Sequence, residues 1–72
     1  MKVLIVEDES FAADRLQELL QQLEPTYEVV NRTTSVKASV AWLSSHQVDL
    51  IFLDIQLSDG LSFSIFEQLR VG

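Results

Sequence analysis

The 72-residue sequence has no cysteine, and it has only five lysine and arginine residues against eleven aspartate and glutamate residues. Without cysteine there is no disulfide framework, no thiolate zinc site and no thiol nucleophile, which excludes a small disulfide-rich secreted fold. The formal net charge is -6. Because nucleic acids and anionic membrane surfaces both attract clustered basic residues, we expect this segment to bind neither of them directly.

Long apolar runs are also missing. Val3–Val6 ends at Glu7, whereas the apolar core of a signal peptide needs about 7 to 15 residues. Leu50–Leu53 is likewise far shorter than the roughly twenty residues of a membrane helix. We therefore expect a cytoplasmic chain without a secretion signal. The hydrophobic fraction of 47% is too high for disorder, and the length allows at most one small domain.

Hydrophobic periodicity predicts an alternation of three strands and three helices. The strands are expected at Val3–Val6, Tyr27–Thr33 and Leu50–Leu53, and the helices from Ser10 until Pro25, from Ser35 through Leu43, and from Leu61 through Leu69. This alternation indicates crossover connections and a parallel sheet with helices on both faces. The first and third strands are wholly apolar, whereas the second is polar enough for an edge, which predicts strand order 2-1-3.

Several single residues have simple structural interpretations. Ser10 and Ser35 are expected to be helix N-caps, and Asp59-Gly60 is a turn signal. Trp42 and the phenylalanines at helical spacing are expected in the core. His46 is expected to be a solvated residue at a helix end, and Arg32 and Lys37 are expected to be surface charges.

Acidic residues follow two of the predicted strands: Glu7 and Asp8 after the first, and Asp54 after the third. Ligands of an open parallel sheet bind beyond the carboxyl ends of the strands, where the strand order reverses. Three carboxylates therefore converge if the first and third strands are neighbours. Such a cluster suits Mg2+, and a carboxylate beside Mg2+ can attack phosphorus to form an aspartyl phosphate.

Either acidic segment alone, Glu7-Asp8 or Asp54, is explained as well by solvated loop charges or by the dipole of a following helix. Their coincidence at one end of the sheet favours the metal site.

These residues resemble the receiver domain of bacterial two-component response regulators. The resemblance rests on Val3–Glu9 and Asp49–Leu61 and on the spacing between them, and it covers all 72 residues. It implies a flavodoxin-like, doubly wound α/β fold and a signalling module that is not itself an enzyme. The sequence around Ala41–Leu43 and Asp54–Phe66 is most similar to that of receivers attached to a LytTR-type DNA-binding domain, which regulates transcription.

The resemblance also implies roles for single residues. Asp54 would accept a phosphoryl group from a sensor histidine kinase, and Asp8 would bind Mg2+ directly. Glu7 would bind the ion directly or through water, and the backbone carbonyl of Gln56 would complete the protein ligands. One departure follows Asp54, because the family commonly has Met-Pro and a longer turn before the position of Asp59-Gly60; this leaves the role of Asp54 unchanged.

The larger departure is length, since the family continues for two more strands and two more helices. Those elements carry a serine or threonine, an aromatic switch residue and a lysine that complete the phosphorylation switch. We therefore expect residues 1–72 to be the N-terminal part of a receiver domain. Such a chain exposes an edge of Leu50–Leu53 and an apolar third helix, which predicts self-association through one of them.

Two alternatives to a phosphoacceptor module share some of these features. A haloacid-dehalogenase-like phosphotransferase also uses an aspartyl nucleophile and Mg2+, but it places a second aspartate two residues after the nucleophile, where this chain has Gln56. The other alternative is a truncated or degenerate receiver that acts only by protein interaction or dimerisation.

Overall fold

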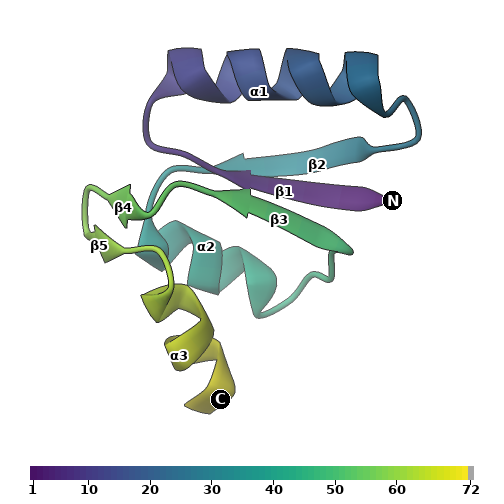
Figure 1. Cartoon of the computed structure of the whole chain (residues 1–72). Helices are drawn as coiled ribbons and strands as arrows, with labels where there is room; N and C mark the ends of the chain where they lie inside the picture. The colour runs from purple at the N-terminus through teal and green to yellow at the C-terminus, as the bar shows by residue number, and fades with distance from the viewer. Residues whose placement is uncertain (72) are drawn as a thin grey trace.

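The chain alternates strands and helices in the predicted order, with one addition. The computed structural model describes residues 1–71; Gly72, the last residue of the expected range 1–72, lies outside the described residues. In chain order the elements are β1 (Lys2–Val6), α1 (Ser10–Leu23), β2 (Glu28–Thr33), α2 (Val36–Leu43), β3 (Leu50–Leu53), β4 (Gln56–Leu57), β5 (Gly60–Leu61) and α3 (Ser64–Val71) (Figure 1). The addition is the short pair β4 and β5.

The three long strands form a parallel sheet of order β2-β1-β3, which confirms the predicted order. β1 pairs with β2 over its whole length, with a register shift between Val3 and Leu4 that gives β2 one extra residue. On its other side, Val3–Val6 pairs with Leu50–Leu53. Because β1 is central and covered on both faces, each residue of Val3–Val6 is 0% exposed, as its unbroken apolar sequence predicts.

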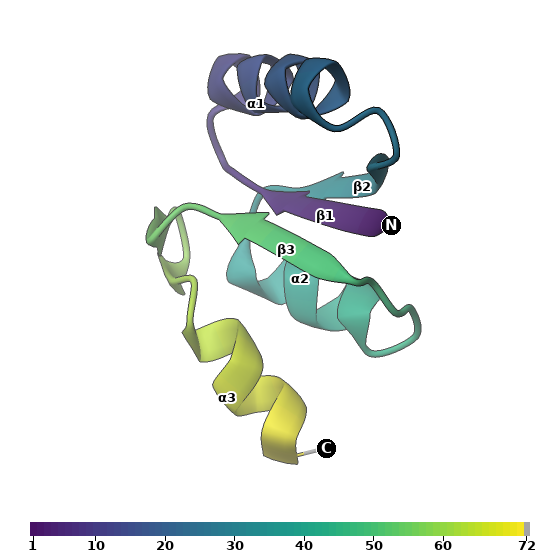
Figure 2. The ribbon, with the colours of Figure 1, turned by 45° about the vertical axis from the view of Figure 1, so that its right-hand side comes forward.

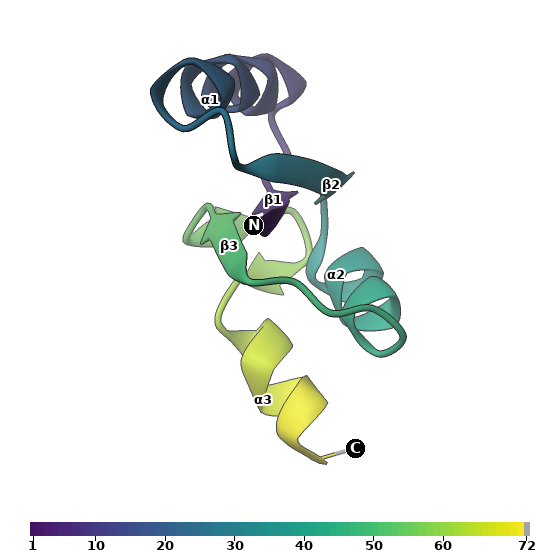
Figure 3. The same cartoon turned by 90° about the vertical axis from the view of Figure 1, so that its right-hand side faces the viewer.

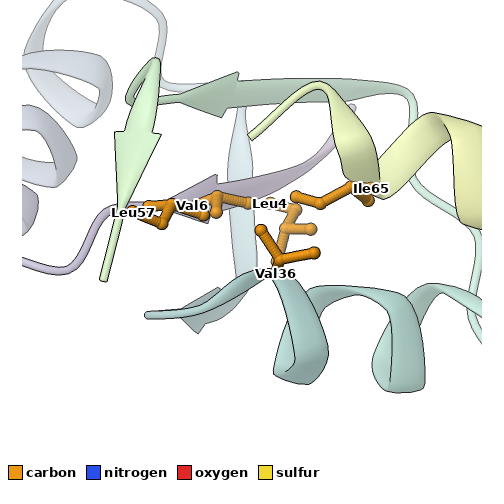
Figure 4. Close-up of a cluster of buried hydrophobic side chains, with 5 residues drawn as sticks. All are labelled: Leu4, Val6, Val36, Leu57 and Ile65. Carbon is orange, nitrogen blue, oxygen red and sulfur yellow. The ribbon is translucent and has the colours of Figure 1, made fainter. Parts of the chain in front are cut away.

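Each face of the sheet has its own core, because successive side chains of β1 point to opposite sides. On one face, Val3 and Ile5 pack with α1. On the other, Leu4 and Val6 belong to a cluster completed by Val36, Leu57 and Ile65 (Figure 4). α1 therefore covers one face and α2 the other, as right-handed crossovers require (Figure 3). α3 lies on the α2 side, and its C-terminal end points away from the sheet (Figure 2).

The N-terminus of α1 differs from the prediction by one residue. Ser10 is the first helical residue, and the N-cap is Glu9, whose carboxylate accepts a hydrogen bond from the Phe11 N–H at 3.4 Å. Both residues carry an oxygen suited to capping, so the sequence does not separate them. The cap of α2 is the predicted one, since the Ser35 hydroxyl accepts a hydrogen bond from the Ala38 N–H at 3.0 Å.

The third helix begins at Ser64 rather than at Leu61. The reason is that Gln56–Leu57 and Gly60–Leu61 pair antiparallel, which places Leu61 in an extended strand. Gly60 has a φ of +144°, a conformation that residues with a Cβ rarely adopt. The predicted turn at Asp59-Gly60 is therefore present, and it joins two short strands instead of leading directly into a helix.

Side chains elsewhere agree with the expectations in part. The phenylalanines Phe11, Phe63 and Phe66, which the sequence predicts in the core, are 71%, 53% and 41% exposed. Trp42 packs against the core, and His46 is exposed and stacked on the Trp42 ring at 4.4 Å between ring centroids. Arg32 is more than a surface charge, because its guanidinium lies 2.6 Å from an Asp14 carboxylate oxygen and joins β2 to α1. Among the described residues, no helix has both the length and the apolar character that crossing a bilayer requires.

Candidate metal and phosphoacceptor site

The candidate site lies at the carboxyl edge of the sheet, where β1 and β3 end side by side. Val6 and Leu53, the last residues of the two strands, are register partners. The Asp54 N–H donates to the Val6 carbonyl at 3.0 Å, and the Glu7 N–H donates to the Thr33 carbonyl at 3.0 Å. Backbone hydrogen bonds therefore fix the start of both acidic segments at the point where the strand order reverses.

The three predicted carboxylates converge at this edge. One carboxylate oxygen from each of Glu7, Asp8 and Asp54 can be chosen so that all three lie within 4.8 Å of one another. Asp8 and Asp54 are exposed, and Glu7 is partly buried. This geometry matches what parallel neighbouring strands predict, and it brings together three hard oxygen ligands.

The surroundings of Glu7 disfavour its charged form. Its Oε2 atom is buried and has no hydrogen-bond partner among residues 1–71, which the structure describes. Loss of water, followed by the negative charge of the neighbouring Asp54, raises the pKa of Glu7 above its ordinary value of 4.5; Asp8 and Glu9 add to the effect. A divalent cation would give that oxygen a partner and offset the repulsion, so these residues fit Mg2+.

A pocket of about 320 Å³ borders Glu7 and Asp54. Its remaining wall is apolar and includes Ala12 and Leu16 of α1 and Phe52 of β3. Glu7 and Asp54 thus border an otherwise apolar pocket on the side of the sheet that α1 covers.

Gln56, the fourth predicted ligand, lies in β4 two residues after Asp54, and its side chain is exposed. Its predicted ligand is the backbone carbonyl, so its position depends on how the segment between Asp54 and α3 is held. At the base of that segment, the buried Ser62 donates to the Ile55 carbonyl through both its N–H, at 2.9 Å, and its hydroxyl, at 3.1 Å.

Asp59 holds the other end of this segment, a contact that the sequence did not predict. Its two carboxylate oxygens accept hydrogen bonds from the N–H groups of Val36, at 2.7 Å, and Lys37, at 3.0 Å. These hydrogen bonds lower the pKa of Asp59 below its ordinary value of 3.8. Nothing local marks the contact, because the partners are more than twenty residues apart, and the sequence indicated only a turn.

The family match and the similar curated proteins both concern response regulators. Residues 3–71 match the family described as the response regulator receiver domain. The Sensory transduction protein LytT of Bacillus anthracis is 37% identical over 70 residues, which are 97% of this chain and 28% of that protein. The Transcriptional regulatory protein LytR of Staphylococcus aureus (strain N315) is 39% identical over 59 residues, which are 82% of this chain and 24% of that protein.

Two solved structures have the same arrangement of elements. The MaeR response regulator bound to beryllium trifluoride superposes with a TM-score of 0.83 at 25% identity, over 99% of this chain and 57% of that chain. A mutant MaeR bound to sulfate gives a TM-score of 0.81 at 24% identity, over 97% of this chain and 57% of that chain. The chain thus spans little more than half of these structures and 28% of LytT.

Proposed function

Because this chain belongs to the response regulator receiver domain family, we propose that it serves two-component signalling by accepting a phosphoryl group on Asp54 with the help of Mg2+. The observation that carries the proposal is the convergence of Glu7, Asp8 and Asp54, one carboxylate oxygen of each lying within 4.8 Å of the others. The similarity to MaeR bound to beryllium trifluoride supports it, because that compound mimics a phosphoryl group when it binds a carboxylate.

The residues would divide the work as follows. A carboxylate oxygen of Asp54 attacks phosphorus, a new O–P bond forms, and the bond from phosphorus to the donor breaks, with its electron pair leaving on the donor. Asp8 would hold Mg2+ directly, Glu7 directly or through water, and the Gln56 carbonyl would complete the protein ligands. When bound, Mg2+ supplies the positive charge that offsets the carboxylates and the phosphoryl oxygens.

The proposed donor is a sensor histidine kinase that meets the chain in the cytoplasm. Residues 1–72 would act as the N-terminal part of a receiver domain, consistent with their match to 57% of the MaeR chain. The names of the LytT and LytR relatives, a sensory transduction protein and a transcriptional regulatory protein, support an output in transcription control. That output would require a LytTR-type DNA-binding segment outside the present sequence.

Phosphorylation by acetyl phosphate tests the proposal. The protein, expressed from its natural reading frame, should gain the mass of one phosphoryl group when Mg2+ is present and none in EDTA. Asp54→Asn should abolish the gain, because an amide is neither an anionic ligand nor a phosphoryl nucleophile. Asp49→Asn is the matched control at the opposite end of the sheet and should be labelled normally. Labelling that survives Asp54→Asn, or none in the unaltered protein, would contradict the proposal.

A second candidate is a module that works only by pairing with another copy of itself. Within the described residues β3 pairs along one edge only, and Phe63 and Phe66 on the α3 side are 53% and 41% exposed. Both features favour association. Sedimentation velocity across the micromolar range should then show concentration-dependent dimers, whether or not Asp54 is labelled. A monomer at every concentration would exclude this candidate.

A further inference from the structure

The connection between β2 and α2 contacts both acidic segments of the site. At the end of β2, the Thr33 carbonyl accepts a hydrogen bond from the Glu7 N–H at 3.0 Å. A few residues later, the N–H groups of Val36 and Lys37 donate to Asp59. Residues 33–37 therefore join the segment after β1 to the segment after β3 from the α2 side of the sheet.

The contact at Asp59 completes the N-terminus of α2. The first N–H groups of a helix have no partner within the helix. Ser35 accepts from Ala38, and Asp59 takes the two donors before it, so Val36, Lys37 and Ala38 are all satisfied. A negative charge is favoured at this end of a helix, and the lowered pKa of Asp59 agrees with an ionised carboxylate there.

The same contact limits where the segment between Asp54 and α3 can lie. Asp59 belongs to the turn between β4 and β5, and the segment is closed at its base by the two hydrogen bonds from Ser62 to the Ile55 carbonyl. Asp54 itself is held independently, by the hydrogen bond from its N–H to Val6. Loss of the Asp59 contact would therefore leave Asp54 in place, and the position of Gln56 would then depend only on the Ser62 hydrogen bonds, the β4–β5 pairing and the buried Leu57 side chain.

We infer that Asp59 is a positioning residue for the metal site: by binding the Val36 and Lys37 N–H groups, it keeps the Gln56 carbonyl where it can complete the Mg2+ ligands. The consequence for Mg2+ rests on the proposed function, whereas the positioning of Gln56 does not. Asp59 touches neither the metal nor the phosphoryl group, and it acts only through the segment that it holds.

The test is an NMR titration that measures Mg2+ binding to the unaltered protein, to Asp59→Ala and to Asp59→Asn. Removal of a residue that orients a metal ligand typically weakens affinity about tenfold or more, so the half-saturating Mg2+ concentration should rise by about tenfold in Asp59→Ala. Asp59→Asn keeps one acceptor oxygen and should show a smaller rise. Asp49→Ala is the matched control, because Asp49 accepts the Lys2 N–H at 2.7 Å at the far end of the sheet.

A merely structural role for Asp59 would lower the folded fraction without moving the half-saturating concentration of the folded molecules. Equal Mg2+ affinity in Asp59→Ala and Asp49→Ala would therefore overturn the inference. So would an unchanged Gln56 amide shift in metal-free Asp59→Ala.

The inference and the proposed function can fail separately. Normal acetyl phosphate labelling of Asp54 with no effect of Asp59→Ala on Mg2+ binding refutes only the inference. Weaker Mg2+ binding in Asp59→Ala, in a protein whose Asp54 is never labelled, supports the positioning role and refutes the proposed function.

Discussion

Glu7→Gln should stabilise the metal-free chain. The substitution keeps the size of the side chain and removes one charge from a cluster whose oxygens lie within 4.8 Å of one another. Because Asp8 and Asp54 are exposed, a water-like dielectric applies, and each like-charge pair costs about 0.9 kcal/mol at that separation. Glu7 takes part in two such pairs, so the free energy of unfolding should rise by about 1–2 kcal/mol.

Thermal unfolding followed by circular dichroism, in EDTA near neutral pH, measures the change. For a domain of this size, 1 kcal/mol corresponds to a shift in Tm of about 4–8 °C. The matched control is Glu18→Gln, which removes the same charge from an exposed position on α1. A Glu7→Gln variant no more stable than Glu18→Gln would refute the reasoning.

The addition of Mg2+ and a fall in pH should each reduce the stability advantage of Glu7→Gln. At about ten times its Kd, Mg2+ should stabilise the unaltered chain by about 1.4 kcal/mol, and it should stabilise Glu7→Gln by less. The pKa of Glu7 is raised in the folded state, so its destabilising effect is present above that folded pKa and is relieved as the pH falls through it towards 4.5. The advantage of Glu7→Gln should therefore shrink in acid. Equal stabilisation of both proteins by Mg2+ would count against Glu7 as a ligand.

Three further outcomes are expected. The pKa of Asp59 is lowered, so its stabilising effect is present above its ordinary value of 3.8 and is lost as the pH falls through the folded pKa; the Tm of Asp59→Asn should lie below that of the unaltered chain near neutrality, and the two should converge in strong acid. Asp8→Ala should weaken Mg2+ binding in a calorimetric titration, and an unchanged affinity would remove Asp8 from the site. Ile65→Ala should lower the free energy of urea unfolding by about 2–5 kcal/mol, whereas Phe66→Ala should have a much smaller effect, because Ile65 is 1% exposed and Phe66 is 41% exposed.

The sheet and the acidic edge could be predicted because local sequence determines them. An unbroken apolar run indicates a strand buried on both faces, and β1 is such a strand. The polar residues of β2 indicate an edge, which fixes the order of the three strands. Once β1 and β3 are parallel neighbours, Glu7, Asp8 and Asp54 must lie at the same edge, so their convergence follows from topology.

The details that could not be predicted depend on contacts between distant residues. Two-residue strands are too short to show a periodic pattern, so the sequence could not distinguish β4 and β5 from the start of a helix. The carboxylate of Asp59 on the N-terminus of α2 and the ion pair of Arg32 with Asp14 each join residues that are far apart in sequence. Such contacts exist only after the strands have placed the loops and helices, and a local pattern does not encode them.

The central strand also sets how the chain folds. β1 has no hairpin partner, because it reaches β2 only after α1 and β3 only after two further elements, so no local turn can nucleate the sheet. A doubling of loop length adds only about 0.6 kcal/mol to the cost of closure, so the longer β1–β3 closure is little harder than the β1–β2 closure. Both pairings should form in one cooperative step, and the amide hydrogens of Leu4 and Ile5 should exchange with solvent only when the whole chain unfolds.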